Sequence, residues 1–394
     1  MEDNDFKKLS IKARTLDLTK KDFTGSSPPA VFIGSKLEYP AVNVGVLSAQ
    51  FINTNPWVYN TPNFWTKKEL SINKIIDLRK NLINSRIKTQ VSAARQKEQT
   101  KIIRQIQEIG MAVSRADIEI KLEKKPSGKM IYDKENMPLG IGAKMNQIKI
   151  LSNTKILPEV ERVNSEKEMR STEAIKYLYK KGLGEQSLTQ LLSIGITGMK
   201  NKRKFVPTKN SITAIDDTIG KQILEEIKNK ETIDKPEYYF GGHLGNYYII
   251  IMIPEVFSYE LFEMSIKEGK ITGCSTDNEN YNGRKEYAKN TAGGYYASRL
   301  AILEKLKLLK KQAGILALRI ITEEYHTPLG VWVCRNSTRI ALEKEGKEYE
   351  TKEELIESIK KLAKEEFRVE IEPIINKSII LKEMNEQSKL KKYF

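Results

Sequence analysis

Asp277 and Glu279 are two carboxylates that stand shortly before Arg284 in the chain. Carboxylate oxygens hold the Mg²⁺ or Mn²⁺ ions of two-metal nucleases, and an arginine can stabilise the charge of a phosphodiester. These three residues are therefore candidate catalytic residues for a nuclease or another phosphodiester-processing enzyme. Asp216 and Asp217 offer a second pair. Adjacent carboxylates more often begin helices or pair with cations, so we predict no metal site, and Mg²⁺ or Mn²⁺ as a cofactor only if the nuclease alternative holds.

Gly293 and Gly294 stand at the beginning of an expected helix. A glycine-rich helix start leaves backbone N–H groups free at the positive end of the helix dipole, which suits a phosphate. Arg284 and Arg299 could close on that phosphate with paired hydrogen bonds. These four residues form a candidate phosphate site. The alternative is a tight turn without a ligand, and the sequence leaves both open.

The chain is strongly basic, with 67 Lys and Arg residues against 51 Asp and Glu residues and a net charge of +16. Such an excess predicts a polyanionic partner, with DNA first and RNA as an alternative, because charge alone does not distinguish them. The densest basic run is residues 200–204, for which a solvated loop is the alternative. We expect nucleic-acid contacts from Lys200, Lys202, Arg203, Lys204, Arg95 and Arg104.

Residues 387–394 combine a glutamine, an aliphatic residue and two adjacent aromatic residues. A 3₁₀ turn has three residues per turn, so Leu390 and Tyr393 would lie on one side, with Phe394 beside them and Gln387 ahead of the turn. This apolar plug resembles the PCNA-interacting peptide of archaeal and eukaryotic replication and repair proteins. We therefore predict the PCNA sliding clamp as a partner, and a terminal segment that is flexible until it binds.

Cysteine and histidine are scarce in this chain. Cys274 and Cys334 are too few for a disulfide framework or a four-cysteine zinc site, so we expect no zinc. His243 and His326 could act as acids or bases, although a hydrogen-bonded turn histidine is commoner. The chain shows no secretion signal and no apolar run long enough to cross a bilayer. We expect a cytoplasmic protein with no membrane partner.

Hydrophobic spacing outlines the first half of the chain. Two short strands are expected at residues 30–34 and 39–47. A long basic helix or a helical pair is expected at residues 67–112, where isoleucine and leucine recur at helical spacing. Residues 116–124 alternate apolar and charged side chains, as a half-buried strand does. Residues 168–198 predict two helices joined by a glycine turn.

The second half is richer in strands. Residues 247–253 form a continuous apolar run typical of a buried strand, and we expect residues 259–264 and 270–274 to pair with it as a meander. A helix is expected at residues 295–313 and another at residues 351–366, which opens on a capping box. Further strands are expected at residues 315–321, 330–334, 369–372 and 378–381.

Together these elements predict an α+β protein with a helical N-terminal half, a β-rich C-terminal half and a flexible C-terminal peptide. At this length more than one domain is expected. The expected parts are a polar N-terminal segment (residues 1–26), an N-terminal α+β region with long basic helices (27–236), a C-terminal α/β region (237–383) and the clamp-binding tail (384–394).

Several motifs, in chain order, resemble the archaeal Nre family of DNA repair proteins. They are Ser27-Pro-Pro-Ala-Val-Phe-Ile-Gly34, Tyr39-Pro-Ala-Val-Asn-Val-Gly45, Phe205-Val-Pro-Thr-Lys209, Ser211-Ile-Thr-Ala-Ile-Asp-Asp-Thr218, Gly283-Arg-Lys-Glu-Tyr-Ala288, Gly293-Gly-Tyr-Tyr-Ala297 and Pro328-Leu-Gly-Val-Trp332. The resemblance implies a role in the DNA damage response and PCNA binding through the terminal peptide, and it supplies no catalytic mechanism. Many family members begin with a four-cysteine segment, which this chain lacks, so any zinc-dependent contact there is absent or replaced. The leading hypothesis is a DNA repair factor recruited by the clamp.

Overall fold

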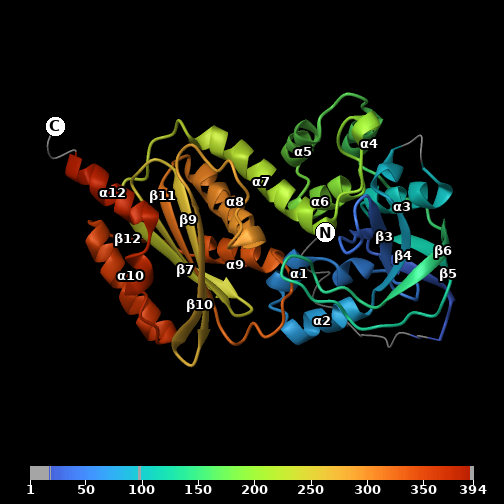
Figure 1. The fold of residues 1–394 in the computed structure, drawn as a ribbon, viewed down its shortest axis with the longest axis horizontal. Coiled ribbons are helices and arrows are strands. Elements are labelled where there is room, and N and C mark those ends of the chain that lie inside the picture. Colours follow the sequence, from blue (N-terminus) through green and yellow to red (C-terminus); the bar gives the residue numbers. More distant parts are fainter. Residues whose placement is uncertain (1–16, 18, 96–98, 391–394) are drawn as a thin grey trace. The chain divides into compact units, whose positions relative to one another are not determined.

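The chain folds into two compact units (Figure 1). The computed structural model describes residue 17 and residues 19–95 and 99–390. Unit 1 consists of Met1–Tyr132, Pro138–Ala174 and Gln186–Ser211, and unit 2 of Asp133–Met137, Ile175–Glu185 and Ile212–Phe394. The chain passes from unit 1 to unit 2 for the last time inside helix α7 (Thr208–Ile227). This boundary lies before the one expected at residue 236.

The described residues of unit 1 form a six-stranded sheet in the order β1-β5-β6-β4-β3-β2. Neighbouring strands run antiparallel except β4 and β6, which run parallel. Successive side chains of a strand point to opposite faces of the sheet. Val42, Val44 and Val46 of β3 therefore share one face of this sheet, and all three are buried. The strands are β1 (Asp22–Ser27), β2 (Ala30–Ile33), β3 (Ala41–Ser48), β4 (Ile83–Gln90), β5 (Ala116–Leu122) and β6 (Gly142–Ile150).

Helix α3 (Lys101–Met111) shows why these residues are helical. Ile103, Ile106 and Ile109 recur at helical spacing and are fully buried. The Thr100 hydroxyl caps the helix by accepting from the N–H of Ile103 at 3.3 Å. The expected helix pair at residues 168–198 is confirmed, with Gly182 at a positive φ in its turn. The other helices are α1 (Pro62–Lys67), α2 (Ile72–Lys80), α4 (Pro158–Ser165), α5 (Ser171–Lys180) and α6 (Glu185–Ser193).

Residues 67–112 do not form one long basic helix. Helices α2 and α3 both lie in this segment, as the helical-pair alternative expects, but strand β4 separates them. The helical spacing ends with α2, and residues 83–90 form strand β4, whose side chains alternate between the two faces of the sheet. Arg86 and Lys88 therefore lie on a strand, two residues apart and on the same face. The strands expected at residues 30–34, 39–47 and 116–124 are confirmed as β2, β3 and β5.

The described residues of unit 2 form a second six-stranded sheet, in the order β10-β9-β11-β8-β7-β12. The expected meander is confirmed for β9 and β10, which pair antiparallel, and wrong for β8 and β9, because β11 lies between those two strands. Strand β11 runs antiparallel to β8 and parallel to β9. Its sequence is buried on both faces, as the centre of a sheet requires. The strands are β7 (Glu237–His243), β8 (Asn246–Ile253), β9 (Ser258–Lys267), β10 (Lys270–Glu279), β11 (Gly314–Ile321) and β12 (Lys347–Glu348).

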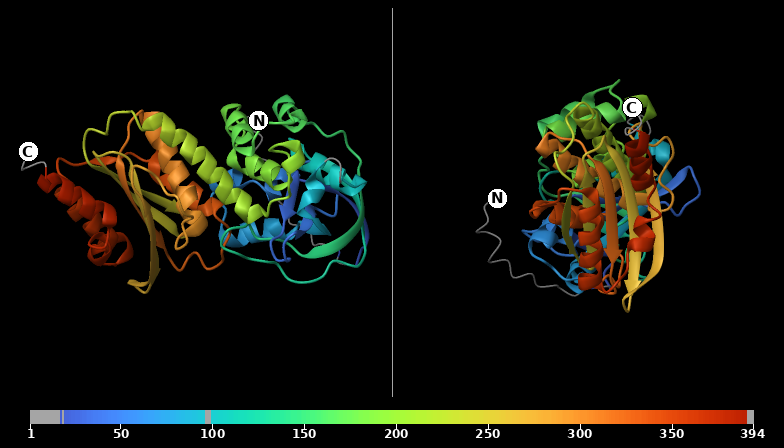
Figure 2. Two further views of the ribbon diagram at one scale, coloured as in Figure 1. Left: turned by 45° about the horizontal axis from the view of Figure 1, so that its top comes forward. Right: turned by 90° about the vertical axis from the view of Figure 1, so that its left-hand side faces the viewer.

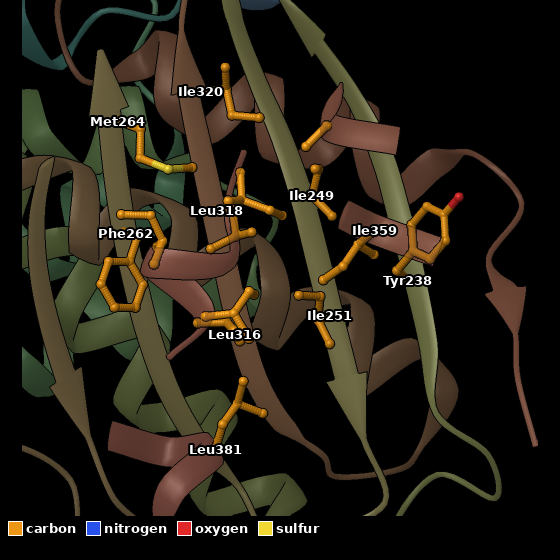
Figure 3. Close-up of a cluster of buried hydrophobic side chains, with 14 of the residues drawn as sticks. Tyr238, Ile249, Ile251, Phe262, Met264, Leu316, Leu318, Ile320, Ile359 and Leu381 are labelled. Atoms are coloured by element: carbon orange, nitrogen blue, oxygen red, sulfur yellow. The ribbon is translucent and has the colours of Figure 1, made fainter. Parts of the chain in front are cut away.

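Helices cover both faces of the unit 2 sheet, giving three layers (Figures 1 and 2). Helices α8 (Ala292–Leu309) and α9 (Trp332–Glu343) lie on one side, where the Tyr259 hydroxyl donates to the carbonyl of Tyr295 at 3.3 Å. Helices α10 (Lys352–Phe367), α11 (Glu372–Ile375) and α12 (Ile379–Leu390) lie on the other. Figure 3 shows that second core, in which Ile359 and Leu381 pack among side chains from β8, β9 and β11.

Three expected strands of unit 2 are helical or irregular instead. Residues 330–334 lead into α9, residues 369–372 lead into α11, and residues 378–381 begin α12. Short apolar runs fit a buried helix as well as a strand, so periodicity alone could not separate them. The helix expected at residues 351–366 is confirmed as α10, with the Thr351 hydroxyl accepting from the N–H of Glu354.

The α+β class is confirmed, with a sheet in each unit. Unit 1 contains more β-strand than was expected for a helical N-terminal half. Strands β4 and β6 were not expected from the sequence, and they join the expected strands in the sheet. None of the helices in the described part of the chain combines the length and apolar character that a membrane crossing requires.

Candidate nucleic-acid interface

The net positive charge of the chain belongs entirely to unit 1. Unit 1 has 34 Lys and Arg residues against 18 Asp and Glu, whereas unit 2 has 33 of each, which together account for the 67 and 51 of the whole chain. A uniform compositional bias would have raised both units alike. The asymmetry concentrates the attraction for a polyanion on unit 1.

Residues 200–204 are only partly a solvent-exposed run. Lys200 is half-buried, and Lys202 and Lys204 are exposed. Arg203 is buried, which corrects its expected place on the nucleic-acid surface. Its guanidinium donates to the carbonyls of Val163, Asn164 and Gly198 at 3.0–3.1 Å. Burial lowers the pKa of Arg203 to about 10, so it stays charged at neutral pH and closes the carbonyl end of α4.

Other basic side chains of unit 1 lie on α3 and on the sheet. Arg104 is exposed on α3, while Arg95 is half-buried and its Nε donates to the carbonyl of Arg203 at 3.4 Å. Arg86 lies directly opposite Lys144 where β4 and β6 pair. Among the described residues, no hydrogen bond or ion pair engages the Arg86 side chain, which is half-buried, so its guanidinium is available to a ligand.

A pocket of about 240 Å³ lies within unit 1, beside Lys204. It forms where the loop before β3 meets the segment leading into α7. Two of the motifs quoted above, at residues 39–45 and 205–209, thus come together in space. Tyr39 is 71% exposed at this pocket, and the Lys204 ammonium donates to its hydroxyl at 3.4 Å.

In unit 2, Asp277 and Arg284 are held in structural contacts. Oδ2 of Asp277 accepts from the N–H groups of Asn290 and Thr291, at 2.9 and 2.7 Å, and from the Thr291 hydroxyl. Its other oxygen accepts from Arg284, which also donates to the carbonyl of Asn278 at 2.7 Å. Asp277 is buried, and it caps the loop that leads into α8. The arrangement fits a structural carboxylate better than a catalytic one.

The candidate phosphate site is closed by the protein itself. Arg299 is buried and pairs with the equally buried Glu279. A Cβ on Gly294 would lie 2.4 Å from Oε1 of Glu263, and one on Gly293 would lie 2.7 Å from Val331. The glycines therefore allow close packing at the start of α8, and the carboxylate of Glu263 occupies the side on which an anion was expected.

Among the described residues, no group of three or more His, Cys, Asp or Glu side chains could hold a metal ion. Asp216 accepts two hydrogen bonds from Arg335, at 2.6 and 2.7 Å, and Asp217 pairs with Lys221. His326 is exposed, and its Nδ1 lies 2.9 Å from the Thr327 hydroxyl. None of these groups is arranged as the metal-dependent alternative requires.

Asp216 belongs to a partly buried chain of ion pairs, in which Asp216 and Arg335 are the buried members and which spacing alone did not reveal. Arg335 also approaches Glu185, which pairs with Arg339 at 2.8 Å, and Arg339 pairs with Glu304. Burial raises the pKa of Asp216 to about 6, against the opposing effect of Arg335. Burial would also raise the pKa of Glu185, but the two arginines outweigh it and bring that pKa to about 2. These partners stand too far apart in sequence for any local pattern to join them.

The predicted clamp-binding sequence, residues 387–394, begins within the described chain and continues beyond its last residue, Leu390. Met384 is buried in the core shown in Figure 3, so packed structure extends into the segment assigned to the tail. Gln387 and Leu390 fall in the last turns of α12. Tyr393 and Phe394 lie outside the described residues.

A two-unit α+β fold with one strongly basic unit is compatible with a protein that binds nucleic acid. Comparison of the sequence with protein families is more specific. The family model described as Archaeal Nre, N-terminal matches residues 6–270, and the one described as Archaeal Nre, C-terminal matches residues 279–393. The chain belongs to the archaeal Nre family.

Three curated relatives match most of the chain. DNA repair protein NreA of Archaeoglobus fulgidus is 34% identical over 349 residues, covering 88% of this chain and 84% of the relative. DNA repair protein NreB of the same organism is 32% identical, covering 87% and 85%. DNA repair protein NreA of Haloferax volcanii is 30% identical, covering 83% and 80%. No solved structure matches the chain.

Proposed function

We propose that this chain is a DNA repair factor that binds DNA through unit 1 and is recruited to it by the PCNA sliding clamp. The observation that carries the DNA contact is the confinement of the whole +16 charge to unit 1. The curated relatives, all named DNA repair proteins, support the process. Their names also favour DNA over RNA, which charge alone does not do.

The contacts are to backbone phosphates. Lys202, Lys204 and Arg104 are exposed, and Lys200 is half-buried. Arg86 and Lys88 add cations on the strand β4. Lysine and arginine contacts to phosphate release counterions and carry no sequence information, so we expect binding without sequence preference.

The clamp contact rests on the terminal peptide. Leu390, Tyr393 and Phe394 supply the three apolar side chains of the plug, and Gln387 supplies an amide. A short peptide that orders on binding loses part of its gain to conformational entropy, so a micromolar affinity, roughly −8 kcal/mol, is reasonable for the isolated tail. The buried anchor of α12 tethers this peptide to a folded unit.

The proposal assigns no catalytic step to the chain. The candidate catalytic residues Asp277, Glu279 and Arg284 are engaged with protein partners, and two of them are buried. A nuclease would need them to hold Mg²⁺ or Mn²⁺ and face a phosphodiester. Metal-dependent cleavage of labelled DNA by the purified protein, lost on Asp277→Ala with the fold retained, would reverse this assignment.

The DNA contact is tested by fluorescence anisotropy of labelled duplex DNA over a salt series. The double variant Lys200→Gln, Lys202→Gln removes two cations of unit 1, and Lys230→Gln, Lys270→Gln removes two exposed cations of unit 2 as a matched control. The log–log salt slope changes by roughly 0.9 for each phosphate of duplex DNA that the protein no longer neutralises. We expect a weaker affinity and a shallower slope for the first variant only. Salt-independent binding by the wild type, or an equal weakening in both variants, would contradict the proposal.

A further inference from the structure

The pocket of unit 1 is built from rigidly placed segments. The backbone N–H of Phe205 donates to the carbonyl of Val91 at 2.9 Å, and that of Val206 donates to Ser193 at 3.0 Å. The Thr208 hydroxyl accepts from the N–H of Ile33 at 2.9 Å, which fixes the start of α7 against β2. The hollow beside these segments therefore exists before any ligand binds.

The floor of the pocket is apolar. Val42, Val91 and Phe205 line it, and all three are buried. Its volume of about 240 Å³ is smaller than the pockets that enclose drug-sized ligands, roughly 300–1,000 Å³. A single ring system, rather than an extended molecule, suits this space.

The rim of the pocket carries an aromatic ring, an amide and a cation. At 71% exposure, Tyr39 is the most exposed tyrosine in the described part of the chain. Its ring is therefore open to stacking. The side chain of Asn210 is exposed, and no hydrogen bond joins it to another described residue. The Lys204 ammonium lies at the same rim.

These three groups match the parts of a nucleotide. An aromatic side chain stacks on any base, an amide both donates to and accepts from a base edge, and an ammonium pairs with a phosphate. The apolar floor and the cationic rim would be mismatched for a purely apolar ligand or for a free inorganic anion. The pocket also lies on the unit that holds the charge excess.

We infer that this pocket receives one unstacked nucleobase of a DNA strand, with Tyr39 stacking on the base, Asn210 bonding its edge and Lys204 pairing with the adjacent phosphate. The inference rests on the proposed function and narrows its substrate class. Bases in a paired duplex are held in the stack, and freeing one is easiest where it is mismatched, damaged or already single-stranded. The favoured DNA is therefore a strand with an unpaired base.

The test compares two DNA probes in one salt condition. One is a fully paired duplex, and the other is a single strand of thymines with one central 2-aminopurine, whose emission is quenched when it stacks on an aromatic ring. Stacking of a base on an aromatic side chain changes affinity by roughly tenfold. We expect the wild type to quench the reporter and Tyr39→Ala to lose the quenching and about tenfold in affinity for the single strand. Its affinity for the duplex should stay unchanged.

Tyr132→Ala is the matched control, because Tyr132 is another exposed tyrosine of unit 1 and lies outside the pocket lining. Asn210→Ala should weaken single-strand binding with quenching retained. Circular dichroism checks that each variant is folded. Because both tyrosines are exposed, we expect their replacement to leave the fold intact.

The outcomes separate the two proposals. Absence of binding to either probe would overturn the proposed function. Salt-dependent duplex binding with no effect of Tyr39→Ala, or with equal effects of Tyr39→Ala and Tyr132→Ala, would overturn the pocket inference alone. Binding of deoxyadenosine monophosphate as tight as that of the strand would assign the site to a free nucleotide instead, and an equal preference for a matching RNA strand would remove its DNA character.

Discussion

At the scale of single residues, Asp216 shows how burial and pairing together set the behaviour of a carboxyl group. Its folded-state pKa is about 6, raised by burial from 3.8 against the opposing effect of Arg335. The folded protein therefore holds that proton more tightly than the unfolded chain does. The resulting contribution to stability is complete below about pH 4 and is lost as the pH rises through 6.

This sign gives a prediction for Asp216→Asn, in which the amide imitates the neutral carboxyl. Relative to the wild type, the variant should become more stable by about 1.4 kcal/mol as the pH rises from 5 to 7.5, because about one pKa unit of the shift lies in this range. Glu185 titrates near pH 2 and does not enter this window. Urea unfolding at several pH values measures the difference. A difference that does not vary with pH, or one that Asp217→Asn reproduces, would contradict the assignment.

Residue-scale prediction from sequence was limited by burial. Arg203 and Lys202 are neighbours in one basic run, and nothing in the run separates them. Only the folded chain shows that Arg203 bonds the carbonyls that end α4 while Lys202 faces solvent. Likewise, the sequence alone does not show whether Asp277 binds a metal or caps a loop. A metal ligand and a loop cap both use the carboxylate oxygens, and only the folded structure shows which groups those oxygens contact.

At the scale of elements, the start of α8 shows a glycine retained for close packing. A Gly→Ala change inside a helix usually stabilises by roughly 1 kcal/mol. We predict the opposite at Gly294, because the new Cβ would lie 2.4 Å from Oε1 of Glu263, which is tied to Arg319. Gly294→Ala should destabilise the protein by about 1–3 kcal/mol. Thermal unfolding checks it, with Gly273→Ala as a control that meets nothing within 4 Å. Equal stability of the two variants would show that Glu263 moves aside freely.

The elements that sequence predicted well are those with a strong period. Strand β8 is a continuous apolar run, and α10 opens on a capping threonine that the structure shows bonded. Strand β4 was missed because it follows α2 directly and repeats the same isoleucine-rich, lysine-rich composition. The place of β11 between β8 and β9 was also missed, since sheet order depends on crossover connections that leave no local pattern.

At the scale of the whole molecule, the two proposed binding functions belong to different units. DNA binding is proposed for unit 1 and clamp binding for the terminal peptide of unit 2. Unit 1 carries the basic excess. Unit 2 is neutral overall and carries α12, in which the proposed clamp-binding sequence begins. Neither property depends on the relative placement of the units. The family membership was accessible from sequence, because its motifs are local. The terminal peptide is also a local pattern, and its clamp contact stays a prediction. The division of charge required the boundaries of the two units.

This division predicts that clamp binding and DNA binding can be removed separately. The double variant Tyr393→Ala, Phe394→Ala should lose most of its affinity for the PCNA clamp of its own organism, because buried aromatic anchors contribute about 2 kcal/mol or more each. Its affinity for duplex DNA should stay that of the wild type. The variant Lys200→Gln, Lys202→Gln should show the reverse, with weakened DNA binding and intact clamp binding. Isothermal titration against the clamp and anisotropy against DNA measure both affinities on the same protein samples. Equal clamp binding by the wild type and the aromatic double variant would sink the recruitment proposal, and loss of both activities in either variant would show that the two are not separate.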